Sequence, residues 1–261
     1  SILRYSRDIA FSAADVYAKA AEARGLWDAR LEALVVDSVI SAESSQEISS
    51  RVAALGWRAD GEVAVLLGVT PPEPDPDAIR KIARKAKADV LIGIQGRRQV
   101  VVVGLLEHSS QAQQEIAQLA YVIEGLFGPG PLVLGPIVPT VSDASRSAKA
   151  ALAANSVAGT TSFTHRPILA DELLPERALA GDQIAKATLL QSLYQPIADS
   201  STELLNTLRT YLECGRSLEA TSKVLFVHAN TVRYRLRRIQ EILGEDATDP
   251  RTAFVLQIAL A

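Results

Sequence analysis

Two neighbouring stretches near the C-terminus carry apolar residues at helical spacing. They are separated by only three residues, 226–228, which predicts two helices joined by a tight turn. Ser217 is a good N-cap for the first helix, and Gly244 is a good C-terminal stop for the second. The positions expected to face a core are Leu218, Thr221, Leu225, Val232, Leu236, Ile239 and Leu243, with Ala220 and Val224 beside the first group.

The outward face of the second predicted helix is polar and cationic. Asn230, Arg233, Tyr234 and Arg237 lie three, four and seven positions apart, so they form one stripe opposite the core positions. Residues 223–238 include five basic side chains and no acid. Arginine can donate two hydrogen bonds to guanine and asparagine can pair with adenine, so this helix suits the major groove of DNA. The alternative is a solvated basic face on an ordinary surface helix.

This two-helix unit resembles the C-terminal helix-turn-helix of the PucR/CdaR family of bacterial transcription regulators. The resemblance rests on His-Ala-Asn-Thr-Val-Arg-Tyr-Arg-Leu-Arg-Arg-Ile at 228–239 and on Asp-Pro-Arg at 249–251, followed by an apolar helix at 254–260. It covers roughly the last quarter of the chain. Many family members carry arginine where this chain has Ala229, which implies a different preferred DNA site.

The unit is also similar to the helix-turn-helix of Fis-type proteins. That similarity implies base contacts from His228 and Arg233, with other side chains nearer the DNA backbone. The recognition helix is expected at about 229–240. The complete set of expected DNA contacts is His228, Asn230, Thr231, Arg233, Tyr234, Arg235, Arg237 and Arg238.

Short apolar runs alternate with amphipathic stretches in the middle of the chain. The pattern predicts the order β-α-β-β-α-β-α, which is the split βαβ or ferredoxin-like plan with helices on one face of an antiparallel sheet. The fold class expected for the chain is therefore α+β. The expected strands are 62–69, 89–94, 99–106 and 131–137, and the expected helices are 77–88, 111–127 and 142–157, with Ile79, Ile82 and Ala86 inward in the first helix.

This sheet pattern resembles the degenerate GGDEF-like domain of the same regulator family. Active GGDEF domains make cyclic dinucleotides, and carboxylates in their hairpin turn hold magnesium and nucleotide phosphates. Here the turn reads Ile-Gln-Gly-Arg-Arg at 94–98, with no carboxylate and only Asp89 nearby. The resemblance therefore implies a domain without that catalysis. Arg97 and Arg98 either bind an anionic ligand or are exposed charges on a hairpin tip.

Helical patterns flank the predicted sheet domain. Residues 12–41 predict a long helix whose apolar stripe either pairs with a second subunit or packs on its own domain. A short helix is expected at 44–57, a longer one at 179–194 that is broken at Pro196, and a further one at 200–214. The expected domains are an N-terminal helical segment at 1–57, the GGDEF-like domain at 58–165, a helical connector at 166–199 and the helix-turn-helix domain at 200–261.

Composition narrows the remaining chemistry. The net charge is −3, so the positive charge near the C-terminus is local rather than general. A single cysteine, Cys214, allows no intrachain disulfide and is consistent with the cytoplasm. The three histidines lack metal-ligand spacing, and no apolar run approaches the roughly 20 residues that span a bilayer. We expect a cytoplasmic protein with no catalytic residues, metal or cofactor. Because methionine is absent, even at position 1, we also expect a piece of a longer protein.

The favoured interpretation is a transcription regulator that binds double-stranded promoter DNA as a homodimer. The upstream domains would serve dimerisation or the sensing of an unidentified small-molecule effector. A resemblance to an actinobacterial subgroup implies fatty-acid biosynthesis genes as targets. One alternative is a nucleotide-binding enzyme, cyclase-like or hydrolytic, with a DNA-binding tail, although no phosphate loop, catalytic triad or paired carboxylate supports it. The other is a protein-interaction module whose basic helix grips an acidic partner.

Overall fold

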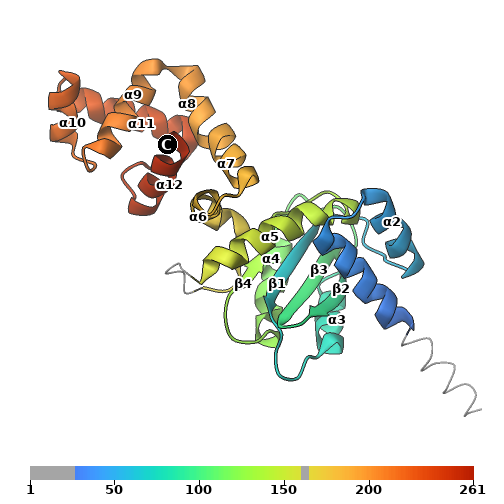
Figure 1. Cartoon of the computed structure of the whole chain (residues 1–261). Coiled ribbons are helices and arrows are strands. Elements are labelled where there is room, and N and C mark those ends of the chain that lie inside the picture. Colours follow the sequence, from blue (N-terminus) through green and yellow to red (C-terminus); the bar gives the residue numbers. More distant parts are fainter. Residues whose placement is uncertain (1–26, 160–164) are drawn as a thin grey trace, which may run out of the picture. The chain divides into compact units, whose positions relative to one another are not determined.

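A computed structural model describes residues 27–159 and 165–261 of the chain. The chain divides into two compact units, and the boundary in the sequence lies between Ala170 and Asp171. The first unit is built on a β-sheet and the second consists of helices (Figure 1). None of the helices in the described ranges combines the length and apolarity needed to cross a membrane.

The sheet of the first unit has the strand order β2-β3-β1-β4-β5. Every neighbouring pair is antiparallel except β4 with β5, which is parallel. The first four strands confirm the predicted ferredoxin-like order. The fifth was not predicted, because two residues are too few to show an alternating pattern. The strands are β1 (Val63–Val69), β2 (Ala88–Gln95), β3 (Arg98–Leu105), β4 (Leu132–Leu134) and β5 (Ile168–Leu169).

Four complete helices accompany the sheet in the described residues: α2 (Ser45–Ala54), α3 (Pro76–Lys85), α4 (Ala112–Ile123) and α5 (Ala144–Ala158). Residues 27–41 are also helical, and the remainder of the helix expected at 12–41 lies outside the described residues. The short helix expected at 44–57 is confirmed as α2. Its N-cap Ser44 and Glu47 form a capping box, and Ile48 and Val52 face inward.

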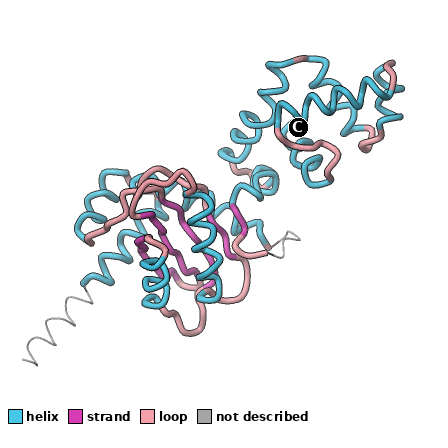
Figure 2. Tube along the Cα trace, turned by 180° about the vertical axis from the view of Figure 1, so that it is seen from behind, coloured by secondary structure: helices cyan, strands magenta, loops and turns pink. Residues whose placement is uncertain are grey.

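Helices cover both faces of the sheet, so the expectation of helices on one face was wrong. α3 and α4 pack on one face, where Ile79 and Ile116 join a core cluster with Leu66. On the other face, the Val65 N–H donates to Ser147 Oγ of α5 at 2.9 Å. Figure 2 shows the sheet with helices in front of it and behind it. The signal was present in β1, whose consecutive residues are buried without alternation, as expected for a strand covered on both sides.

The end of α3 differs from the sequence pattern. The helix was expected to reach residue 88 with Ala86 inward, but it ends at Lys85, and Ala86 is exposed. Lys87 adopts a left-handed backbone with φ 54°, which ends the helical path and starts β2 one residue later. Ala83 takes the inward position instead, with 1% of its surface exposed.

The helices of the second unit are α6 (Leu174–Leu179), α7 (Gln183–Leu189), α8 (Gln195–Ser200), α9 (Thr202–Glu213), α10 (Leu218–Leu225), α11 (Ala229–Leu243) and α12 (Pro250–Leu260). The prediction of a single helix at 179–194 was wrong. Gly181, with φ 97°, interrupts the helical path, and Asp182 caps a new helix. Pro196 does not break it. A π-helical turn at Leu190–Tyr194 leads from α7 into α8, and its wider backbone accommodates the proline ring.

Candidate nucleic-acid interface

A buried apolar stripe anchors α11 in the helical unit. Val232 and Ile239 are fully buried, and Leu236 is 7% exposed. They share a core cluster with Leu208 and Tyr211 of α9. The predicted spacing of four and three therefore places one side of α11 against α9 and directs the opposite side to solvent.

A three-residue turn joins α10 to α11. Phe226 adopts a left-handed backbone with φ 54° and ψ 40°, and the following N–H, of Val227, donates to the Ser222 carbonyl at 3.1 Å. This hydrogen bond closes α10 as a Schellman motif. His228 then caps α11, because its Nδ1 accepts from the Asn230 N–H at 3.1 Å. Since Nδ1 accepts, the proton of the neutral ring is on Nε2, which remains a donor at the exposed surface.

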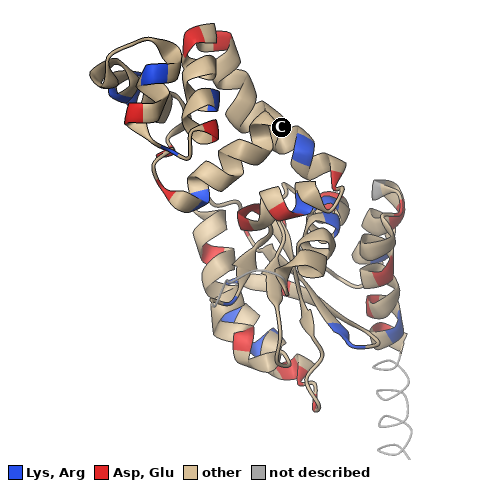
Figure 3. Cartoon of the chain, turned by 60° about the vertical axis from the view of Figure 1, so that its left-hand side comes forward, with Lys and Arg blue, Asp and Glu red and all other residues tan. Residues whose placement is uncertain are grey.

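The outward stripe of α11 is exposed as a continuous surface. Asn230, Arg233, Tyr234 and Arg237 are all exposed, with Tyr234 at 68%, and Thr231 beside them is half-buried. Arg233 Nη1 donates to Asn230 Oδ1 at 2.6 Å. Arg237 has no hydrogen bond or ion pair to any described side chain. The structure therefore brings these residues together on one surface. The charged positions of both units are coloured in Figure 3.

Arg235 lies apart from that surface. Its Nη2 lies 2.9 Å from a carboxylate oxygen of Glu203, its Nη1 donates to Thr207 Oγ1 at 3.2 Å, and only 19% of the side chain is exposed. Both partners belong to α9. Arg235 thus ties α11 to the core of the unit, and the expectation that it faces the DNA is not supported by this geometry.

Arg238 is exposed but is not a free cation. Its Nη1 lies 2.6 Å from Glu241 Oε2, one helical turn further along α11. The hydrogen bond and charge of Glu241 raise the pKa of the Arg238 guanidinium. Glu241 stands three positions after Arg238, the last residue of the basic run, so the positive surface of α11 weakens toward its C-terminal end.

Sequence reasoning missed two apolar residues at this end of the unit. Phe226 is 94% exposed and Val224 is 57% exposed. Val224 was expected beside the core face of α10, and this was wrong. In α10 only Thr221 is fully buried, because the helix is short and meets its neighbours along a narrow strip.

The hairpin turn of the sheet unit carries no acidic site. The turn residues Gly96 and Arg97 connect β2 to β3, and Arg97 and Arg98 are exposed. Asp89 is not near the turn, because it lies at the opposite end of β2 and is paired in register with Gly104. Its Oδ2 accepts from the Arg58 N–H at 3.0 Å. Across the described ranges, no three His, Cys, Asp or Glu side chains converge to hold a metal.

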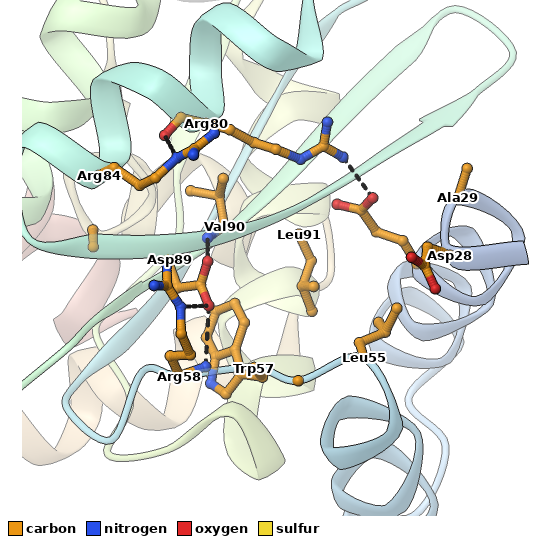
Figure 4. A pocket seen from close by; sticks show the side chains of 13 residues that line it. Asp28, Ala29, Leu55, Trp57, Arg58, Arg80, Arg84, Asp89, Val90 and Leu91 are labelled. Atoms are coloured by element: carbon orange, nitrogen blue, oxygen red, sulfur yellow. Dashed lines mark hydrogen bonds and ion pairs between the residues drawn. The ribbon is translucent and has the colours of Figure 1, made fainter. Parts of the chain in front are cut away.

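A cavity of about 540 Å³ lies at the β2 edge of the sheet (Figure 4). On one side, Glu32 accepts from the Ile92 N–H at 2.7 Å and pairs with Arg80 at 2.6 Å. Glu32 thus protects the open edge of the strand. Arg84 also lines the cavity, and its Nε donates to the Arg80 carbonyl at 3.2 Å. It has no acidic partner among the described residues. The sequence pattern did not single out Arg84, because it occupies an ordinary polar position of an amphipathic helix.

Comparisons with known proteins connect both units to regulators. Residues 204–261 match the family described as PucR C-terminal helix-turn-helix domain, and residues 41–157 match the GGDEF-like domain. An uncharacterized protein of Mycobacterium tuberculosis is 42% identical over 271 residues, which cover 99% of this chain and 64% of that protein. The purine catabolism regulatory protein of Bacillus subtilis is 37% identical over 125 residues, 46% of this chain and 23% of that protein.

A solved structure extends the similarity over both units. The regulator of polyketide synthase expression from Bifidobacterium adolescentis aligns with a TM-score of 0.74 and 32% identity, covering 88% of this chain and 91% of that one. The chain spans 64% of the length of its mycobacterial relatives. From the two domain matches in this order and the near-complete overlap with a solved regulator, the chain belongs to the PucR family, in which a GGDEF-like domain precedes a C-terminal helix-turn-helix domain.

Proposed function

We propose that this chain is a transcription regulator whose helix α11 enters the major groove of promoter DNA. The observation that carries the proposal is the exposed stripe of Asn230, Arg233, Tyr234 and Arg237, rooted by a buried stripe on the opposite side of the same helix. Such a helix presents donors to base edges while its bundle holds it rigidly. The family membership supports the same conclusion.

Within this interface we assign different roles along α11. Arg233 stands in the first turns, and its bond to Asn230 Oδ1 orients the guanidinium while its other N–H groups stay available for guanine O6 and N7. Thr231, Tyr234 and Arg237 are assigned to phosphates and sugars, and the exposed His228 is assigned to a base edge together with Arg233. Arg235 is left out because it binds α9.

The decisive experiment is footprinting with the full chain. The probes are the upstream region of its own gene and the promoters of fatty-acid biosynthesis genes, which the resemblance to the actinobacterial subgroup suggests as targets. We expect a protected site bound at least about 1,000-fold more tightly than random DNA at the same salt concentration. Arg233→Ala should lose about 1–3 kcal/mol of binding free energy on that site and relax its sequence preference. Equal affinity of the parent for all sequences would refute specific regulation.

We also propose that the protein acts as a homodimer on two half-sites about one helical turn, or ~34 Å, apart. The support is an apolar surface on the helical residues 27–41. Trp27 and Leu34 are seven positions apart on one side of this helix and are 67% and 53% exposed. Monomeric proteins rarely expose large contiguous apolar patches, and such patches often mark sites of protein contact.

For effector sensing we propose the cavity at the β2 edge. Its support is the Arg84 guanidinium, which has no described acidic partner and can donate hydrogen bonds to a carboxylate or phosphate. The test is a thermal unfolding screen with small carboxylate and phosphate compounds. A stabilising compound should lose its effect in Arg84→Ala and keep it in Arg97→Ala, which removes an exposed arginine at the hairpin tip. A shift that survives in Arg84→Ala would place the effector elsewhere.

A further inference from the structure

Phe226 combines two unfavourable features at one position. Its side chain is 94% exposed, although it is a large apolar group. Its backbone has φ 54°, a left-handed conformation that favours glycine and is strained for residues with a Cβ. Glycine at this C-cap would close α10 with less strain and without an exposed ring. The Schellman cap of α10 accounts for the left-handed backbone, but the described residues leave the ring uncovered, and this exposure indicates a role outside the protein.

The surroundings of Phe226 indicate which partner it contacts. The residue stands two positions before His228, the N-cap of α11, and therefore beside the first turn of the proposed recognition helix. That turn is the part of a recognition helix directed most closely at base edges. Val224 adds exposed apolar surface next to it. Arg233 and Arg237 follow further along α11 and are both exposed, so the charge of this helix complements DNA rather than an apolar protein surface.

We propose that Phe226 reads a thymine by packing against its C5-methyl group in the major groove. This inference rests on the proposed function. Thymine is the only base that presents a methyl group there, and an apolar side chain without donors distinguishes it from cytosine. Phe226 therefore adds sequence preference at a base pair flanking those contacted by α11.

The variant that tests this inference is Phe226→Gly. It removes the ring and relieves the left-handed strain, so its unfolding midpoint should equal or exceed that of the parent. Its affinity for the footprinted site should nevertheless fall roughly tenfold, while binding to random DNA stays the same. Lys87→Gly is the matched control, because Lys87 has the same φ of 54° in the sheet unit. The control should change stability in the same direction and leave DNA affinity unaltered.

A deoxyuridine scan of the site identifies the methyl group. Each thymine of a half-site is replaced in turn by deoxyuridine, which lacks only the C5-methyl. The parent should lose roughly tenfold in affinity at one position, and Phe226→Gly should be insensitive at that same position. If every replacement affects both proteins equally, the thymine contact is wrong.

Two further outcomes separate the possible failures. A parent that shows no preferred site overturns the proposed function and this inference together. A parent that footprints normally, beside a Phe226→Gly variant that binds as well as the parent, overturns this inference alone. If sedimentation shows that Phe226→Gly dissociates a dimer and loses DNA binding for that reason, Phe226 contacts a second copy, and the thymine contact is likewise refuted.

Discussion

Arg235 and Arg237 are two positions apart on α11 and have opposite environments. The guanidinium of Arg235 is bonded to Glu203 and Thr207 and is 19% exposed, whereas Arg237 is exposed and lacks a described partner. Neighbouring arginines of the same basic run therefore have different roles. Arg235 holds α11, the proposed recognition helix, against α9, and Arg237 is available to phosphates in the proposed complex.

These environments predict different results for the two alanine variants. Arg237→Ala should weaken binding to all DNA sequences alike and reduce the slope of log affinity against log salt by about 0.9, because one phosphate contact is lost. Arg235→Ala should lower the free energy of unfolding by roughly 1 kcal/mol through the loss of its bonds to α9. Salt-dependent fluorescence titration and urea unfolding measure the two effects. An unchanged salt slope for Arg237→Ala would contradict its assignment to the DNA surface.

Removal of the negative charge of Glu241 is expected to raise the affinity for DNA. Its carboxylate lies 2.6 Å from Arg238 Nη1, so it offsets a cation on the proposed interface and repels phosphates. Glu241→Gln should tighten binding to specific and random DNA alike by about two- to fivefold at low salt, with the gain shrinking as salt rises. Glu213→Gln makes the same change of net charge at an exposed position on α9 and should have less effect. Equal gains in both variants would mean that only the net charge matters.

At the scale of elements, Asp182 holds the start of α7. Its Oδ1 accepts from the Ile184 N–H at 2.9 Å, and its Oδ2 lies 2.9 Å from the guanidinium of Arg177, a side chain only 2% exposed. Burial alone would raise the pKa of this carboxyl. The Ala185 and Ile184 N–H groups and Arg177 outweigh burial and lower the pKa below its ordinary value. One side chain thus caps a helix and neutralises a buried cation.

Removal of this carboxylate should destabilise the helical unit. Asp182→Ala is expected to lower the free energy of unfolding by about 2–3 kcal/mol, since it removes an N-cap and one partner of a buried ion pair. Asp171→Ala should cost less, because Asp171 is 61% exposed and lies 3.7 Å from Arg177. Urea unfolding at pH 7 compares the variants. A larger effect for Asp171→Ala would reverse the assignment.

The lowered pKa of Asp182 also gives a pH dependence. The contribution of a carboxylate with a depressed pKa is fully present above its unfolded value of about 3.9 and is lost as pH falls through its folded value. Stability of the parent should therefore decline below about pH 4. Asp182→Asn, which can still cap the helix, should decline less steeply. Asp246 has a pKa lowered by the N–H and hydroxyl of Thr248 and acts in the same direction, so the difference between the two proteins isolates Asp182.

At the scale of the whole molecule, the proposed dimer rests on the apolar side of residues 27–41. Leu34→Glu should shift the protein toward the mass of a monomer in sedimentation, because a charge would be buried in the interface. Binding to a two-part site should weaken, whereas binding to a single half-site should stay unchanged. Tyr121→Glu places the same charge at an exposed position of α4, 62% exposed, and should leave the mass unaltered. A Leu34→Glu variant with the mass of the parent would remove this surface from the dimer proposal.

Periodicity and turn chemistry determined much of this protein without any tertiary information. The spacing of Val232, Leu236 and Ile239 defined the buried side of α11, and Ser217 and Gly244 marked helix ends that the structure confirms. The valine-rich runs and the order of helices predicted the first four strands. These features depend on residues close together in the chain, so local sequence was enough to reveal them.

Only the tertiary structure decided what depends on distant partners. Arg235 and Arg237 look alike in the sequence, and the distinction came from Glu203 and Thr207, about thirty residues upstream. The second helical layer on the sheet, the cavity beside Arg84 and the exposure of Phe226 likewise arise from how separate segments meet. Hydrophobic spacing predicts which face of an element is buried. The packing of other elements determines what covers that face and which side chains stay in solvent.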